Sequence, residues 1–152
     1  AGANVTMAPG IYYLDSSDLK VAGNAKLSGS GVTIVFTASK GKNYASASIA
    51  SNAIINLSAP TSGPTAGIVL FGDRTMPQGT SFKLTGGGTQ NWTGAIYLPR
   101  ADLTYAGGAG GGAGCTQIVA DTITFTGNSN LSLSCSGAGV SAMGQQVALL
   151  VE

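Results

Sequence analysis

The sequence predicts an all-β chain coiled as a right-handed parallel β-solenoid, with about three strands in each turn. Three observations lead to this fold class: helix signals are almost absent, short runs of alternating apolar and polar residues recur, and these runs superpose in register. A β-sandwich is the alternative fold. It is less favoured, because a sandwich need not keep one five-residue pattern in register five times.

The composition also favours regular β-structure. Charged residues make up 9% of the chain, against about 25% in an ordinary soluble domain. Glycine accounts for 24 of the 152 residues, and apolar residues for 43%, which excludes a disordered chain. A chain of this length forms one domain, so we expect residues 1–152 to be a single β-solenoid domain.

The first family of runs carries the alternation most clearly. Each run has apolar residues at its first and third positions, a polar residue at its second, and a small residue at its end. Alternation with period two buries one face of a strand and exposes the other. We therefore expect Leu19, Phe82, Leu103 and Ile123 to point inward. The runs are LKVAG (19–23), ASIAS (47–51), FKLTG (82–86), LTYAG (103–107) and ITFTG (123–127).

Two further families complete each turn. The second begins with Asn, a residue that tolerates the left-handed conformation needed at a corner. The third is almost continuously apolar, as in strands that are covered on both faces. The second family is NAKLS (24–28), NAIINLS (52–58) and NSNLSLS (128–134); the third is GVTIVF (31–36), GIVLF (67–71), GAIYL (94–98) and CTQIVA (115–120).

Loops fill the places where the repeat lengthens. Successive runs of the first family start 28, 35, 21 and 20 residues apart, so the early turns carry insertions, which we expect at 43–45, 60–64 and 74–79. The glycine-rich segment at 106–114 leads into a strand, whereas a phosphate-binding loop leads into a helix and carries a lysine. It is better explained as a flexible replacement for the second strand of its turn.

The charges exclude several classes of protein. The net charge is +1 and the seven basic residues are scattered, so no nucleic-acid partner is expected. No apolar run approaches the roughly 20 residues of a membrane span. With no histidine and only two cysteines, the chain has no residue set for zinc, and we expect no metal and no cofactor.

Three charged residues occupy equivalent positions relative to the third-family runs. Asp73, Arg100 and Asp121 each lie six residues after the start of a third-family run. Stacked in successive turns, they would form a structural ion ladder. An arginine between two carboxylates favours their charged forms and lowers both pKa values, which is a poor arrangement for acid–base catalysis. We therefore expect no enzyme.

Two other sites follow from single residues. Cys115 and Cys135 are 20 residues apart, the spacing of one late turn, and flank the same corner, which predicts a disulfide between successive turns. Two free buried thiols are the alternative. A disulfide would indicate an oxidising compartment. The single tryptophan, Trp92, is either a platform on which a sugar stacks or a cap over the core.

Several segments together resemble the C-terminal domain of TadG-like proteins of the Tad (Flp) pilus system of Gram-negative bacteria. The resemblance covers nearly the whole chain, and CTQIVADTI and GNSNL are its most specific parts. The segments are PGIYYL (9–14), GSGVTIV (29–35), LSAPTSGP (57–64), GAIYLP (94–99), CTQIVADTI (115–123), GNSNL (127–131) and VALLVE (147–152).

The resemblance implies a location and a set of partners but no catalytic residues. In such proteins a membrane-anchoring helix precedes an exported region, so the chain would be the exported C-terminal part of a longer membrane-anchored protein. We expect a non-catalytic structural or adhesive module in the periplasm or outside the cell, with pilus or cell-envelope proteins as partners. The alternative is a carbohydrate-binding or carbohydrate-processing β-helix domain, whose ligand would be a surface glycan.

Overall fold

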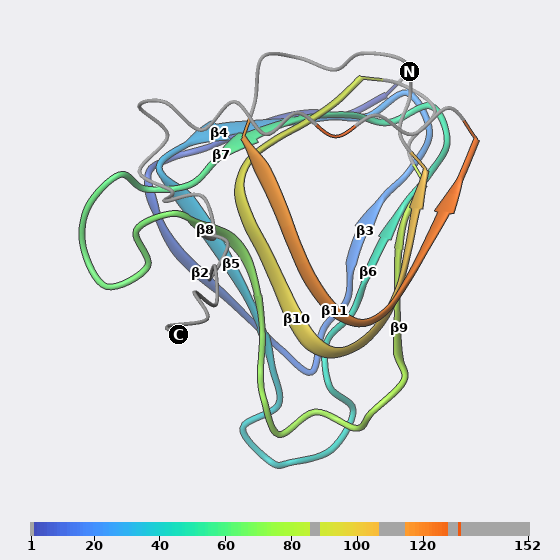
Figure 1. Ribbon diagram of the computed structural model, residues 1–152. Helices are drawn as coiled ribbons and strands as arrows, with labels where there is room; N and C mark the ends of the chain where they lie inside the picture. The colour runs from blue at the N-terminus through green and yellow to red at the C-terminus, as the bar shows by residue number, and fades with distance from the viewer. Residues whose placement is uncertain (1, 86–88, 107–114, 128–130, 132–152) are drawn as a thin grey trace, which may run out of the picture.

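The computed structural model describes residues 2–85, 89–106, 115–127 and 131, and within these residues it contains strands and no helix. The all-β class predicted from the sequence is thus confirmed. The strands are β1 Asn4–Met7, β2 Gly10–Asp15, β3 Leu19–Val21, β4 Lys26–Ser30, β5 Val32–Thr37, β6 Ala47–Ile49, β7 Ile54–Ser58, β8 Ile68–Gly72, β9 Thr80–Leu84, β10 Gln90–Ala106 and β11 Thr116–Thr126 (Figure 1).

Every pairing between the described strands is parallel, which excludes the antiparallel sheets of a β-sandwich. The strands pair into one curled parallel sheet, and they stack along the three sides seen in Figure 1; we call these three stacks the first, second and third sheets. The first sheet contains β1, β4, β7 and the start of β10. The second contains β2, β5, β8, the middle of β10 and the first half of β11; the third contains β3, β6, β9 and the ends of β10 and β11.

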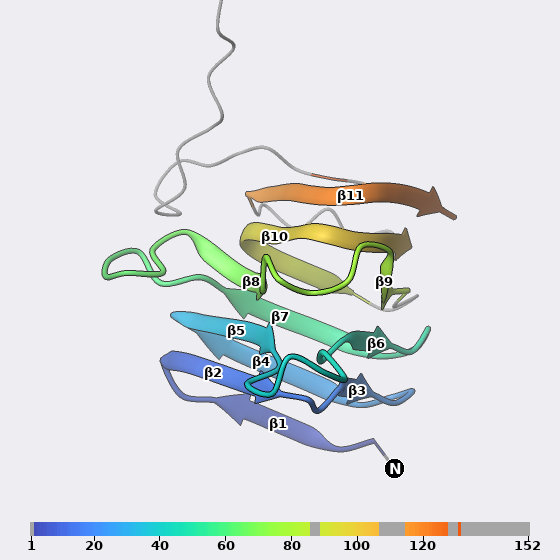
Figure 2. The same cartoon turned by 90° about the horizontal axis from the view of Figure 1, so that it is seen from below.

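The chain returns to each sheet one layer further along, so that β1 to β3 form one end of the described structure and β11 the other (Figure 2). The first-family runs stack in the register that their alternation predicts. Leu19 lies beside Ala47, and Leu103 lies between Phe82 and Ile123. The second and third runs are linked by the pairing of Ser48 with Lys83 and of Ile49 with Leu84.

Three of the four side chains predicted to point inward lie in or against the core. Phe82 and Leu103 are buried, and Leu19 is half-buried at the end of the stack. Ile123 is 39% exposed because it lies on the last described strand of its sheet. On the outer face, Lys83 is exposed, as predicted, and so are Lys20 and Thr124, whereas Thr104 is half-buried.

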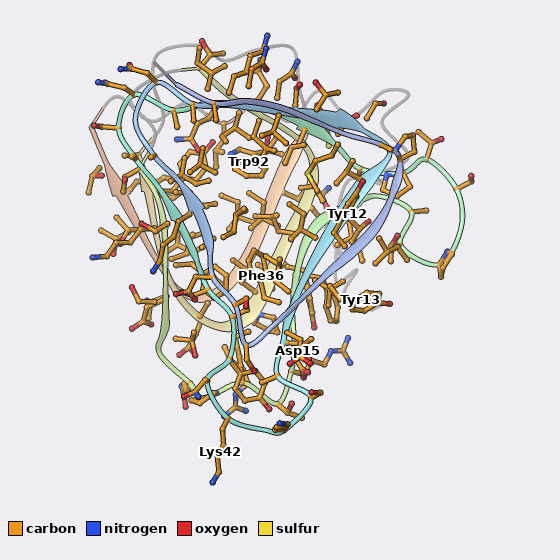
Figure 3. All side chains as sticks on the ribbon, turned by 180° about the vertical axis from the view of Figure 1, so that it is seen from behind. Tyr12, Tyr13, Asp15, Phe36, Lys42 and Trp92 are labelled. Atoms are coloured by element: carbon orange, nitrogen blue, oxygen red, sulfur yellow. The ribbon has the colours of Figure 1, made fainter. Side chains whose placement is uncertain are left out.

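The core lies between the three sheets. The rings of Phe36, from the second sheet, and Phe82, from the third, meet edge to face with their centroids 5.0 Å apart. Figure 3 shows Phe36 and Trp92 inside the coil and Tyr13 outside it. Close packing of this kind makes each large inward side chain important to stability.

The corners use residues that suit their backbone angles. Asn24 has a φ of 60°, the left-handed conformation expected for the asparagine that opens a second-family run. Gly94 has a φ of 134°, and a Cβ atom there would lie 2.7 Å from the Cβ of Ala59. Only glycine fits at Gly94, where the chain passes from the first sheet to the second.

The insertions lie between strands, at the predicted places. The segment 38–46, between β5 and β6, is held at both ends by carboxylates of the preceding layer. Ser39 N donates a hydrogen bond to Asp15 Oδ1 over 2.8 Å, and Ser46 N donates to Asp18 Oδ1 over 2.9 Å. Three sequence-based predictions concern residues outside the described ranges: most of the second-family run at 128–134, the glycine-rich segment after Ala106, and Cys135.

Candidate binding face

The outer face of the second sheet carries a column of apolar and aromatic side chains. Alternation along β2 turns Tyr12 and Leu14 toward the core and Tyr13 outward, where it is 67% exposed. Strand register aligns Tyr13 with one residue on each later strand of this sheet. We call this column the aromatic stripe; it consists of Tyr13, Val35, Phe71, Tyr97 and Val119.

Two aromatic rings in the stripe stack on each other. The ring centroids of Phe71 and Tyr97 are 5.4 Å apart and their planes are inclined by 23°. The guanidinium carbon of Arg74 lies 5.4 Å from the Tyr97 centroid, within the range of a cation–π contact. Phe71 and Tyr97 thus turn one face toward each other, and both residues are half-buried.

A polar border runs beside the stripe. Asp73 N donates to the Phe36 carbonyl over 3.0 Å, which places Asp73 beside Thr37. Thr37 Oγ1 donates to Asp73 Oδ2 over 2.8 Å, and Thr75 donates to Asp73 Oδ1 from both its hydroxyl and its backbone nitrogen. The hydroxyl of Thr75, followed by its backbone N–H, lowers the pKa of Asp73. Asp73 is therefore charged at neutral pH.

A polar cavity of about 400 Å³ lies next to this border. It is lined by Asp15, Ser16, Ser39, Lys40, Lys42 and Asn43. Hydrogen bonds from the side chain and backbone of Ser39 lower the pKa of Asp15. Asp15 and Tyr13 project from the same side of β2 (Figure 3), so an exposed aromatic ring stands beside a cavity with groups that donate and accept hydrogen bonds.

The ion ladder predicted from the six-residue offset does not form among the described residues. There, the one ion pair within 4.0 Å joins Lys20 to Asp18, and Arg100 pairs with neither carboxylate of the predicted ladder. Asp121 instead accepts a hydrogen bond from Gln78 Nε2 over 3.0 Å, and Asp73 is held by threonines.

Irregular register explains the error. The pairing shifts between Ala95 and Ile96 on one side of β10 and between Leu98 and Asp102 on the other. Gly94 also lies beside Thr116 rather than Cys115. A constant sequence offset therefore does not keep Asp73, Arg100 and Asp121 in one column, because each bulge changes which residues are neighbours.

Trp92 is a core residue, not a sugar platform. It is 1% exposed and lies beside Leu57 in the first sheet. Its indole Nε1 donates to Gln90 Oε1 over 3.0 Å, and Gln90 Nε2 donates to the Ala106 carbonyl over 2.8 Å. A buried indole normally needs such a partner for its N–H. Of the two interpretations of Trp92, packing against the core is correct.

The other expected sites are only partly within the described structure. Cys115 is fully buried, and its predicted partner Cys135 lies outside the described residues, so the disulfide stays a prediction. Among the described residues no three histidine, cysteine, aspartate or glutamate side chains are grouped closely enough to hold a metal ion. The same part of the chain has no helix with the length and apolarity that a membrane crossing requires.

The sequence did carry a signal for the aromatic stripe. Third-family runs are apolar on both faces of the strand, and this pattern predicts strands that are covered on both sides. The structure shows such cover at Thr33, which is fully buried; its hydroxyl donates to the Ile68 carbonyl and is hydrogen-bonded to Thr65 Oγ1. Further along the same sheet the apolar column is only half-buried, and Tyr13 is exposed.

No protein-family model, curated protein or solved structure matched the chain when it was compared with each of these sets.

Proposed function

We propose that the chain is a right-handed parallel β-solenoid with three strands per turn, and that it serves as a non-catalytic structural or adhesive module of the bacterial cell envelope. In this proposal the aromatic stripe is the contact surface for a protein partner. The three columns of parallel strands and the glycine and asparagine corners support the solenoid. The resemblance to TadG-like proteins supports the location, in the periplasm or outside the cell, and a pilus or envelope protein as partner.

The aromatic stripe is the observation that carries the proposal. Tyr13, Val35, Phe71, Tyr97 and Val119 make a continuous apolar column on an outer face, flanked by charged residues. Aromatic residues surrounded by a polar rim are typical of protein interfaces, where they contribute much of the binding energy. A rigid sheet beneath them keeps their relative positions fixed.

Photo-crosslinking in the producing bacterium tests this role. A photoreactive phenylalanine analogue at Tyr97 should crosslink the chain to one pilus or envelope protein. The matched control places the analogue at Lys83, on the outer face of the third sheet. Equal products from both positions, or none from Tyr97, would contradict a partner bound at the stripe.

Carbohydrate binding is the second candidate, favoured by the exposed Tyr13 ring beside the polar cavity at Asp15. Sugars combine stacking on an aromatic face with hydrogen bonds to neighbouring polar groups. The rest of the stripe suits this less well, because Phe71 and Tyr97 turn their faces toward each other.

A glycan array, read for both binding and turnover, separates the two candidates. Binding of a glycan that Tyr13→Ala abolishes would favour the second candidate. Absence of binding and turnover would favour the structural or adhesive module.

A further inference from the structure

The last described layer of the stack carries exposed apolar side chains on β11. In the layer beneath it, Leu103 and Tyr105 of β10 belong to the core and are 1% and 2% exposed. Ile123 and Phe125 lie beside them in the same two columns, yet they are 39% and 49% exposed. The ring of Phe125 meets the ring of Tyr105 with 6.0 Å between centroids, so Phe125 packs on the layer beneath while about half of it stays exposed.

The described part of the sheet also ends at β11. This strand pairs with β10 and with no other described strand. The edge of a sheet readily accepts a further strand, and covering apolar side chains with apolar ones is favourable. A strand on the side of β11 opposite β10 would bury Ile123 and Phe125 as fully as the residues beneath them.

The sequence after β11 is able to supply such a strand. Leu131 is half-buried and packs against the core, so the chain returns to the core after β11. Residues 132–152 follow, and these 21 residues (152 − 131) match one late turn, since the last first-family runs start 21 and 20 residues apart. Their longest apolar run is VALLV (147–151).

Spacing aligns this run with the exposed pair on β11. Val147 follows Ile123 by 24 residues (147 − 123), and Leu149 follows Phe125 by 24 (149 − 125). Both values fall within the 20 to 35 residues that separate the earlier first-family runs. Because side chains alternate along a strand, Val147 and Leu149 would share one face and Leu150 would lie on the other.

We propose that residues 147–151 pair with the side of β11 opposite β10, as a parallel strand of the third sheet, and that Val147 and Leu149 cover the two exposed side chains. The run differs from the earlier first-family runs at its second position, where Ala148 replaces a polar residue. A sheet edge that is covered in this way is closed to a second copy of the chain. The inference goes beyond the proposed function and does not depend on it.

Crosslinking within the purified 152-residue chain tests this placement. A photoreactive phenylalanine analogue replaces Phe125, a change that keeps the aromatic ring. Irradiation should join position 125 to residues 147–151, as read by tandem mass spectrometry of a proteolytic digest. The matched control carries the analogue at Tyr13, on β2 in the first layer, and should give no product with residues 147–151.

A mixture of isotopically heavy and light chains distinguishes contacts within a chain from contacts between chains. The proposal predicts products that are entirely heavy or entirely light. Products that join a heavy chain to a light one would show that a second copy covers β11 and would overturn the proposal. Products of position 125 with other segments alone, or no product, would overturn it as well.

Two adjacent leucines provide an independent test through thermal stability. Leu149→Ser removes a side chain that covers β11 and should lower the Tm by about 5 °C or more. Leu150→Ser changes the same residue type on the opposite face and should lower the Tm by less than about 2 °C. Equal shifts in thermal melts of the two variants would contradict the proposed strand.

Discussion

The ring of Phe71 stacks on the ring of Tyr97 on the outside of the second sheet, with 5.4 Å between centroids. The stacking joins the neighbouring strands β8 and β10 on the outer face of the sheet, and the two rings also form part of the outer surface. Stacked aromatic pairs contribute about 0.5–1.5 kcal/mol beyond the burial of their area. The aromatic stripe thus has a structural role as well as the binding role that we propose for it.

Replacing Phe82 with alanine should lower the free energy of unfolding by about 3–5 kcal/mol, the usual cost of truncating a buried phenylalanine. Phe82 is fully buried and its ring meets Phe36. Its neighbour Lys83 is exposed, so Lys83→Ala should cost less than about 0.5 kcal/mol. Denaturant melts of the two variants measure both values, and equal costs would contradict the inward and outward assignment.

Stability should fall at acidic pH, in part through Asp73. The folded-state pKa of Asp73 lies below its ordinary value of 3.8, mainly because Thr75 donates hydrogen bonds to the carboxylate. A lowered folded pKa stabilises the fold above the unfolded pKa, and this contribution is lost as the pH falls from about 3.8 through the folded pKa.

The Asp73→Asn variant should therefore have a lower free energy of unfolding than the parent protein at pH 7. As the pH falls below about 4, the variant should lose less of its free energy of unfolding than the parent does. Thermal melts across this range measure the slopes. Some acid sensitivity should remain, because Asp15 and Asp18 also have lowered pKa values. Identical pH profiles of the parent and the variant would show that Asp73 does not contribute.

Cys115 and Cys135 should be joined in protein exported by the cell. A disulfide that closes a loop of about 20 residues contributes roughly 3 kcal/mol, mainly by restricting the unfolded chain. Mass spectrometry of unreduced protein treated with a thiol-blocking reagent measures the bond. If both cysteines are alkylated, no disulfide is present, and the argument for an oxidising compartment fails.

The repeat could be predicted from the sequence because alternation and stacking use the same residues. Leu103 aligns with Phe82 and Ile123 in the structure as in the sequence pattern. Register within a strand was harder to predict. The register shifts on both sides of β10, against β8 and against β11, so the column expected for Asp73, Arg100 and Asp121 was wrong. No local pattern reveals where an extra residue is inserted.

The sequence pattern also could not predict which strand faces are exposed to solvent. An apolar residue on an outer face looks the same whether a loop covers it or not. The segment between β7 and β8 covers Thr33 through Thr65, but Tyr13 lies in the first layer and is exposed. The exposure of Trp92 was equally open, since the sequence allowed both a sugar platform and a cap over the core, whereas in the structure Trp92 belongs to β10 and is buried.

The most direct test of the central claim is a measurement of partner-dependent adhesion or pilus assembly in bacteria that carry changes on one outer face or the other. The stripe variant is Phe71→Ser with Tyr97→Ser, and the matched variant is Lys83→Ser with Lys20→Ser on the third sheet. With export and folding of both variants verified by protease resistance, the stripe variant should lose the phenotype and the matched variant should keep it. An unchanged phenotype in the stripe variant, or equal loss in both, would contradict a binding role for the stripe.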